Sequence, residues 1–305
     1  MRKIYFLTIG TLLCLFTACE HKELCYDHFH AEKLQVVFDW KNAPLARPAS
    51  MRLYLFPIDG GKMIPYEFAG RDGGAISVPA GRYRVLCINN DVTSVIYTNV
   101  DRFENFKAYT TDASMTGLPR NISDNESARR SPDMLWSDRK EDVNIVAGKQ
   151  GQSITLYPDT SVCRYTVEIR NVINLEGIPS SNVTGAITGV SGGLMVGRNV
   201  LDNTPVTVPF ETRHDESSTI TADFLAFGHS KDDGLKHWLF IYVDIPGVGK
   251  YYNTYDITAQ LSKAVGLRHV HILLEGLPLP KPIEDESGLQ PEVDGWQEVP
   301  VEIQM

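Results

Sequence analysis

The amino-acid sequence predicts an all-β fold of two β-sandwich domains in tandem, placed after an N-terminal signal peptide. Three observations lead to this prediction. Short runs rich in Val, Ile, Tyr and Phe recur along the chain, turn signals rich in Gly and Asp separate them, and amphipathic helical patterns are scarce. Regularly spaced short strands with such turn signals are typical of sandwiches or barrels.

The first 18 residues have the order of a signal peptide. Two basic residues precede an apolar run at 4–16, and small residues stand just before Cys19. The run is too short to span a membrane, which takes about 20 residues. The sequence around Cys19 resembles a lipobox, in which the thiol is acylated. We therefore predict a lipoprotein held at the bacterial outer membrane or cell surface by a palmitate-type lipid on Cys19, with residues 19–32 as its tether. The alternative is an ordinary secretory signal followed by a chance cysteine.

The charge balance is acidic. The chain of 305 residues carries 29 Lys and Arg against 38 Asp and Glu, a net charge of −9. Loss of Arg2 and Lys3 with the signal peptide leaves 27 basic side chains and a net charge of −11. Nucleic-acid binding requires a basic surface, so it is not expected. Electrostatic adhesion to anionic lipid is not expected either, so the membrane contact would be made through the lipid.

Strand-like runs continue to the end of the chain, and each alternates or is rich in β-branched and aromatic residues. Convincing helical patterns are scarce, and the best is at 258–265, where Asp256 or Thr258 can cap the start and Gly266 can end it. The expected strands are 34–40, 51–57, 82–89, 94–99, 143–146, 153–157, 163–170, 183–190, 205–210, 220–227, 237–245, 269–274 and 299–303.

Two polar stretches interrupt the strands. Residues 110–133 predict a long surface loop, and residues 278–295, with four prolines and an acidic run, predict an exposed excursion before the last strand. A Gly- and Gln-rich break at 149–152 favours a domain boundary there. The predicted domains are residues 33–150 and 151–305, both of ordinary domain size.

No catalytic motif or paired-Cys zinc spacing is present, so we expect no enzyme activity, no metal and no cofactor. His269 and His271 share one strand face, but no carboxylate partner can be named, so hydrogen-bonded or solvated imidazoles are expected. Cys87 and Cys163 alternate with apolar residues and are expected to be buried, inert thiols. A row of aromatic side chains, Trp238, Phe240 and Tyr242, could stack on a glycan but is more typical of a core.

Three runs in the first half carry a resemblance to known proteins. Residues 36–40 (VVFDW), 51–57 (MRLYLFP) and 76–86 (ISVPAGRYRVL) follow the cadence of transthyretin-like seven-stranded sandwiches. With the segment that begins at Cys19 and the strand that begins at Cys163, the chain resembles the fimbrillin-like surface lipoproteins of gut and oral anaerobes. This resemblance implies an anchor or accessory subunit of a type V fimbria, assembled by β-strand exchange, with fimbrial subunits or another surface protein as partners.

One departure from that family bears on the role. Polymerising fimbrillins are cut after an Arg that follows the first strand, and the matching place here is Ala46-Arg47-Pro48. A proline after Arg obstructs trypsin-like cleavage, which favours an uncut, lipid-held subunit. The last strand alternates Val299, Val301 and Ile303, which predicts an apolar row that binds the partner or guards its site.

For the last strand, the alternative is a permanent edge strand that closes the second domain. For the chain as a whole, the alternative is a monomeric surface lipoprotein that binds a glycan or a protein. A β-sandwich hydrolase is the least favoured, because no nucleophile and base can be named.

Overall fold

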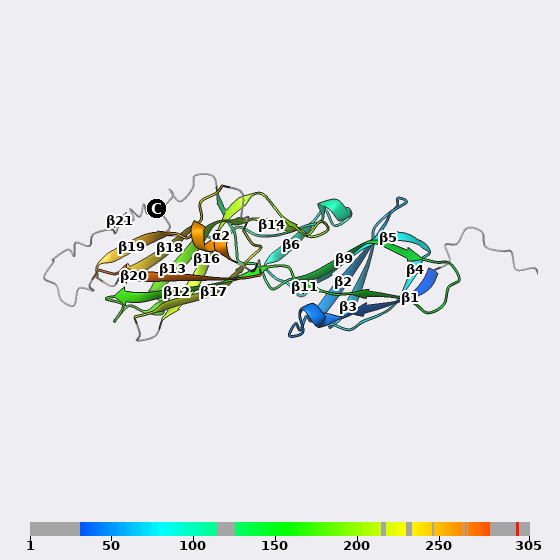
Figure 1. Cartoon of the computed structure of the whole chain (residues 1–305), viewed down its shortest axis with the longest axis horizontal. Coiled ribbons are helices and arrows are strands. Elements are labelled where there is room, and N and C mark those ends of the chain that lie inside the picture. Colours follow the sequence, from blue (N-terminus) through cyan, green and yellow to red (C-terminus); the bar gives the residue numbers. More distant parts are fainter. Residues whose placement is uncertain are drawn as a thin grey trace, which may run out of the picture.

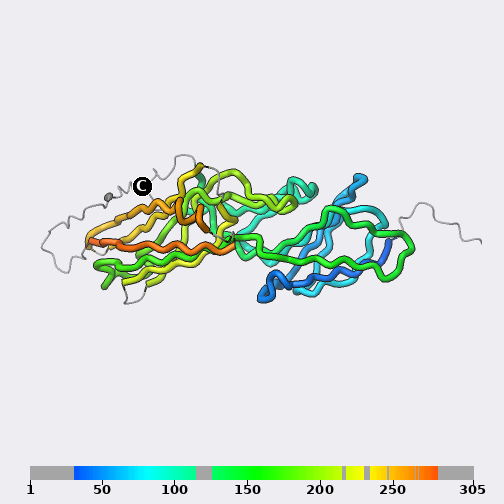
Figure 2. Tube along the Cα trace, in the orientation of Figure 1, coloured from blue at the N-terminus to red at the C-terminus, as the bar shows by residue number. Residues whose placement is uncertain are grey.

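The computed structural model describes residues 31–114, 126–214, 218–229, 234–245, 247–264, 266, 268–280 and 297–298. These residues are mostly strands, which confirms the all-β prediction. The molecule is long and narrow, with the early strands β1 to β5 at one end and the strands after β12 at the other (Figure 1). The Cα trace passes between the two ends where β11 leads into β12 (Figure 2).

Two sheets make up the end that holds the early strands. The first sheet has the order β10-β1-β4, and the second has the order β11-β9-β5-β2-β3. Alternate apolar residues of both sheets, among them Val36, Leu53 and Val85, point into one shared core. The strands of the first sheet are β1 (Ala31–Phe38), β4 (Gly73–Pro79) and β10 (Gln152–Leu156), and those of the second are β2 (Ser50–Pro57), β3 (Ile64–Ala69), β5 (Gly81–Asn89), β9 (Trp136–Ile145) and β11 (Asp159–Thr160).

Strand β1 is the central strand of its sheet. It pairs in parallel with β10 and antiparallel with β4, so both of its edges are occupied. The approach to β4 is close, because a Cβ on Gly73 would lie 2.3 Å from the Val36 carbonyl oxygen. A positive φ of 87° at Gly73 also favours glycine there.

A nine-stranded sheet forms the other end, in the order β20-β12-β17-β16-β13-β18-β19-β21, with β8 beside β16. It encloses the largest apolar core, to which β12, β13, β18 and β20 all contribute. The short helix α2 (Thr258–Lys263) covers part of that core with Leu261 and confirms the predicted helix. The strands are β8 (Ser127–Ala128), β12 (Cys163–Ile173), β13 (Val183–Ser191), β16 (Pro205–His214), β17 (Ile220–Ala226), β18 (Trp238–Ile245), β19 (Gly249–Asp256), β20 (His269–Pro278) and β21 (Gln297–Glu298).

A small sheet joins residues from both halves of the chain. Its order is β15-β14-β7-β6, so the hairpin of β6 (Val95–Thr98) and β7 (Lys107–Thr110) pairs with β14 (Gly193–Met195) and β15 (Val200–Leu201). A third apolar cluster lies here, and we call it the junction cluster. It contains Tyr54 and Phe106 from the first half and Leu194 and Phe227 from the second.

The predicted domain boundary at 150/151 stays a prediction, and strand pairing crosses it. Strand β10 follows residue 151 but pairs with β1, whereas β7 precedes residue 150 but pairs with β14. The predicted surface loop at 110–133 contains β8, which pairs with β16. Within the described residues, no helix is long and apolar enough to cross a membrane.

Candidate functional site

Four residues near the ends of the chain were predicted to carry function. They lie outside the described residues: Cys19, Val299, Val301 and Ile303. Just before the last three, β21 pairs antiparallel with β19, with Glu298 opposite Tyr251. A partner-binding or guarding role for the last strand therefore stays a prediction.

Strand β12 presents a row of polar side chains on the outer face of the large sheet. Its inward residues, such as Tyr165 and Val167, enter the core, so the alternating residues Arg164, Thr166 and Glu168 point outward. This follows from the period of two in a strand.

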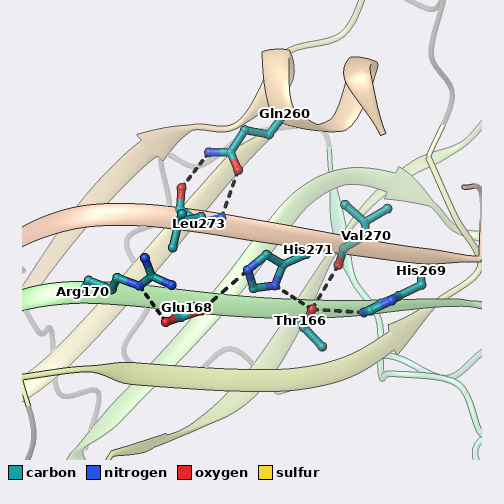
Figure 3. Close-up of polar contacts among 8 residues, drawn as sticks. All are labelled: Thr166, Glu168, Arg170, Gln260, His269, Val270, His271 and Leu273. Carbon is teal, nitrogen blue, oxygen red and sulfur yellow. Dashed lines mark hydrogen bonds and ion pairs between the residues drawn. The ribbon is translucent and has the colours of Figure 1, made fainter. Parts of the chain in front are cut away.

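Thr166 lies at the centre of a polar cluster with β20 (Figure 3). Its Oγ1 is 3.1 Å from His269 Nε2 and 3.0 Å from His271 Nδ1. The parallel register of β12 and β20 places both imidazoles beside Thr166, because Thr166 pairs with His271 and Arg164 with His269. The prediction of hydrogen-bonded histidines is therefore confirmed.

Carboxylates and guanidinium groups continue this face. Glu168 accepts a 2.7 Å hydrogen bond from Arg170 Nε, and this bond lowers the pKa of the Glu168 carboxyl. Its other oxygen is 3.7 Å from His271 Nε2. Asp223 on β17 accepts a 2.8 Å bond from Arg164 Nε, which likewise lowers the pKa of Asp223.

The cluster holds a hydroxyl, an imidazole and a carboxylate on an outer face of the sheet. The carboxylate of Glu168 is engaged mainly by Arg170, and the His271 side chain is half exposed to solvent. The Thr166–His271 contact is within hydrogen-bond reach, whereas the 3.7 Å between His271 and Glu168 is longer than a hydrogen bond. In the part of the chain that the structure describes, no three His, Cys, Asp or Glu side chains are grouped so that they could hold a metal ion.

A cleft of about 990 Å³ opens beside this cluster, lined mainly by residues of β16 and β17 and also by residues of β12 and β13. We call it the β16–β17 cleft. The two strands pair only from Thr212 to His214 and from Ile220 to Ala222, and they diverge beyond these residues. Pro209 and Glu211 line one wall, Asp223 and Leu225 line the other, and His271 lies at the rim.

Stacked aromatic rings form the floor of the cleft. The ring of Phe210 lies on that of Phe224 with a centroid distance of 4.3 Å, and Phe224 stacks in turn on Tyr165 at 5.5 Å. Gly185 makes room for this stack, because a Cβ there would lie 2.3 Å from the Phe210 ring. The floor is therefore part of the core and is held firmly.

The expected buried thiols are confirmed. Cys87 and Cys163 are fully buried, and burial raises the pKa of both, that of Cys163 to about 11.

The prediction that the aromatic row of β18 belongs to a core is confirmed for Phe240 and Tyr242, and Trp238 packs against them. Phe240 and Tyr242 are buried in a small separate cluster, because the alternate residues of β18, such as Ile241, face the main core.

The Arg47 site is exposed but tied down locally. Its Nη1 donates to the carbonyl oxygens of Pro44 and Ala46, at 2.9 and 2.8 Å. Arg71 also donates to the Ala46 carbonyl, at 2.8 Å, and Pro48 is buried. Local hydrogen bonds thus hold the residues just before the Arg47–Pro48 bond, and the proline itself obstructs cleavage there.

The outward polar row on β12 could have been found from its alternation with apolar residues. The cleft could not, because it depends on where two strands of a sheet separate.

Comparison with known proteins agrees with the resemblance inferred from the sequence. The sequence profile of a family described as "Domain of unknown function (DUF5119)" matches residues 18–211. A relative from Bacteroides ovatus, named "Putative fimbrium anchoring subunit Fim4B", is 24% identical over 229 residues. These residues cover 74% of this chain, and the chain spans 66% of the length of that relative.

Solved structures share the fold. A crystal structure described as that of "a putative adhesin" from Bacteroides ovatus has a TM-score of 0.65 at 19% identity, over 88% of this chain and 99% of that one. The fimbrial anchor protein Mfa2 from Porphyromonas gingivalis has a TM-score of 0.52 at 16% identity, over 80% and 90%. The family profile covers more than half of the sequence, and the chain therefore belongs to the family described as a domain of unknown function, DUF5119.

Proposed function

We propose that this chain is a non-enzymatic, lipid-anchored cell-surface protein that serves as an anchor or accessory subunit of a fimbria-like adhesive polymer. The match to the relative named as a fimbrium anchoring subunit, over 74% of the chain, carries the proposal. The fold shared with a fimbrial anchor protein supports it.

The attachment would run from the lipid on Cys19 into the folded part of the molecule. Strand β1 starts at Ala31, twelve positions after Cys19, so little chain separates lipid and sheet. Both edges of β1 are paired, which suits a strand that has to hold its place when the tether is pulled. The local contacts around Arg47 favour a chain that keeps β1 after export.

Fractionation of cells that express a Cys19→Ala variant tests the lipid. The Cys19→Ala variant should leave the membrane fraction or remain unprocessed. A Cys25→Ala variant, the control, should be processed and should fractionate with the membrane as the wild type does. Mass spectrometry of the wild type should find the acyl group on Cys19. An unmodified Cys19 in a chain that still sediments with membranes would refute the lipid anchor.

Assembly would use strand pairing, with the last strand as the element that exchanges. The pairing of β21 with β19, just before Val299 in the sequence, supports this proposal. Deletion of residues 293–305 should leave a folded chain that captures a synthetic peptide of the deleted sequence or a fimbrial subunit. A deletion that unfolds the large sheet, with no rescue by the peptide, would make this a permanent strand and end its exchange role.

A further inference from the structure

Three turns gather at the end of the first sandwich where β1 begins. Ala31 of β1 lies opposite Pro79 of β4, so the turn between β4 and β5 is at this end. In the other sheet, Gly81 of β5 lies opposite Ile145 of β9, which places the end of β9 here as well. The end of β2 pairs with the start of β5. We call this surface the tether end, and its turns are residues 58–63, 79–81 and 146–151.

The tether end lies at one extreme of the long molecule. Strands β1, β4 and β5 lie at the opposite end from β18, β19 and β20 (Figure 1). The Cα trace turns back at the extreme of that end in the segment between β9 and β10, drawn in green (Figure 2). The chain from Cys19 enters the first sheet at this same end, because β1 starts at Ala31.

Two apolar side chains project from these turns. Ile58 is 39% exposed and Val146 is 43% exposed. The N–H of Ile58 donates to Arg82 O of β5 at 2.9 Å, and β5 pairs on its other side with β9, which ends just before Val146. Adjacent strands are about 4.8 Å apart, so the backbones at the two positions lie about 10 Å apart. Both side chains therefore belong to one small surface.

The carboxylates of this end are engaged by neighbouring groups. Glu32 Oε1 accepts a 2.9 Å hydrogen bond from Gly148 N, which fixes the turn at 146–151 to β1. Asp142 accepts a 2.6 Å bond from Nη2 of Arg82. Asp142 and, to a smaller extent, Asp59 raise the pKa of this guanidinium, so Asp59 also lies within its field.

Two lysines of the same turns are left for an outside partner. Lys62 and Lys149 are exposed, and neither ammonium forms an ion pair with any residue that the structure describes. Asp59 is the one carboxylate in the three turns, so the turns carry a net positive charge, whereas the whole chain carries −9. The tether end is thus opposite in charge to the chain as a whole.

A bilayer surface fits a small, positive and partly apolar end of this kind. Binding at the membrane interface grows with the apolar area that enters it and with attraction of basic side chains to anionic lipid. The acidic charge of the whole chain opposes adhesion to such lipid, so the approach is favourable only at the tether end.

The position of the tether favours a bilayer over a protein partner. Twelve positions separate Cys19 from Ala31, and a chain of that length spans at most about 40 Å when fully extended. A lipid on Cys19 would therefore keep the tether end within that distance of the membrane. No other end of the molecule is held so close.

We propose that the tether end rests on the membrane surface, with its apolar side chains among the lipid headgroups and its lysines on their phosphates. Ile58 and Val146 supply the apolar contact. Lys62 and Lys149 meet the phosphate groups of anionic lipids. The proposal rests on the lipid anchor proposed above, and it adds an orientation in which the nine-stranded sheet faces away from the membrane.

The test attaches the folded chain to vesicles without the natural lipid. A hexahistidine tag replaces Cys19 in a chain of residues 20–305, and the vesicles contain phosphatidylcholine, phosphatidylglycerol and a nickel-chelating lipid. Cys25→Ser removes the remaining cysteine outside the described residues. The thiols of Cys87 and Cys163 are buried and should stay unlabelled.

The environment-sensitive fluorophore NBD then reports contact with lipid. On Ile58→Cys or Val146→Cys, its emission should shift to the blue and rise severalfold on vesicles, and a headgroup-level lipid quencher should reduce it. Leu45→Cys is the matched control, because Leu45 is 87% exposed but lies between β1 and β2, at the opposite end of the same sandwich. NBD there should keep its spectrum in water.

Charge reversal tests the lysines. Lys62→Glu combined with Lys149→Glu should lower the ratio of inserted to free NBD at residue 146 by about fivefold for each lysine, the effect of a lysine close to an anionic bilayer. Lys250→Glu combined with Lys263→Glu makes the same change in the exposed part of the other end. That control pair should leave the ratio within about twofold, because distant charges are screened by salt.

Equal spectra for NBD at residues 45, 58 and 146 on vesicles would overturn the proposal, and so would an equal effect of the two pairs of charge reversals. The nickel-chelating lipid separates this result from the anchor. An unmodified Cys19 would refute the lipid anchor without changing the NBD spectra, whereas water-like spectra at residues 58 and 146 would refute the membrane contact and leave the lipid anchor standing.

Discussion

Replacement of Phe106 by Ala should weaken the link between the two ends of the molecule. Phe106 is fully buried in the junction cluster, and its ring meets Tyr54 edge-on at 5.0 Å and Tyr97 at 5.7 Å. Its carbonyl accepts a 2.8 Å bond from Val196 N, in the segment that follows β14. The backbone bond to Val196 therefore crosses residue 150, and the side chain belongs to a cluster with residues from both sides of it.

The expected cost follows from this burial. Truncation of a fully buried Phe to Ala costs about 3–5 kcal/mol, the sum of lost transfer free energy and a cavity that relaxes only in part. The two aromatic contacts are part of this total and place Phe106 toward its upper end, because such pairs are worth about 0.5–1.5 kcal/mol beyond their area. The free energy of unfolding should thus fall by about 3–5 kcal/mol.

Hydrogen exchange under increasing denaturant can distinguish a loss of overall stability from a loss of coupling between the two ends of the molecule. In the wild type, β2 and β12 should become exchangeable in one transition, whereas in Phe106→Ala they should open at different denaturant concentrations. Phe68→Ala is the matched control, since Phe68 is buried in the first sandwich against Phe38 at 5.4 Å and lies outside the junction. It should lower stability without separating the transitions.

Two results would refute this reasoning. One is a loss below about 1 kcal/mol in Phe106→Ala, which would mean that the site closes over the cavity. The other is separate opening of β2 and β12 in the wild type, which would mean that the junction cluster does not couple the two ends.

Three further predictions follow from single contacts. Gly73→Ala should cost about 1–3 kcal/mol in thermal unfolding, because the new Cβ meets the Val36 carbonyl at a positive φ; an unchanged melting temperature would contradict this. For Asp133, burial alone would raise the carboxyl pKa, but bonds from Ser94 and Thr93 outweigh it and lower the pKa. Asp133→Asn should therefore cost about 1–2 kcal/mol above pH about 4, and the difference should vanish as the pH falls through the folded-state pKa; a cost that grows in acid would be inconsistent. A chain of residues 31–162 keeps the pairs of β10 with β1 and should melt cooperatively, whereas residues 31–150 should not; equal melting of the two would refute this.

Apolar alternation predicted the strands whose inner face is buried. Strand β12 is the clearest case, because Tyr165, Val167 and Ile169 enter the core as their spacing indicates. Several strands escaped prediction, among them β3 and β19, because their side chains are mostly half-buried or exposed. Residues 136–142 of β9 read as a charged stretch, although they pair with β5 and β11 through the backbone. Where neither face of a strand is deeply buried, backbone pairing produces no apolar alternation in its sequence.

Local sequence patterns could not predict which sheet β10 joins. Residues 153–157 were expected to open a second sandwich, yet β10 returns to β1 and places Ile154 and Leu156 in the first core. Either sheet would bury the same alternate residues of β10. The pairing is decided by which core has room for Leu156, and that depends on contacts made across more than a hundred residues of chain.

Prediction of the cleft would have required more than knowledge of which strands pair. Continuation of the β16–β17 register would set Phe210 directly opposite Phe224, and Pro209 next to it cannot donate across the gap. The rings instead lie face to face at 4.3 Å and 3°, with Phe210 extended over Gly185 of β13. Each of these residues alone is compatible with an ordinary strand. Their combined effect depends on a register that β13 imposes on β16 and β12 imposes on β17. The opening between the strands is therefore a property of four strands together, and the sequence of any one of them does not predict it.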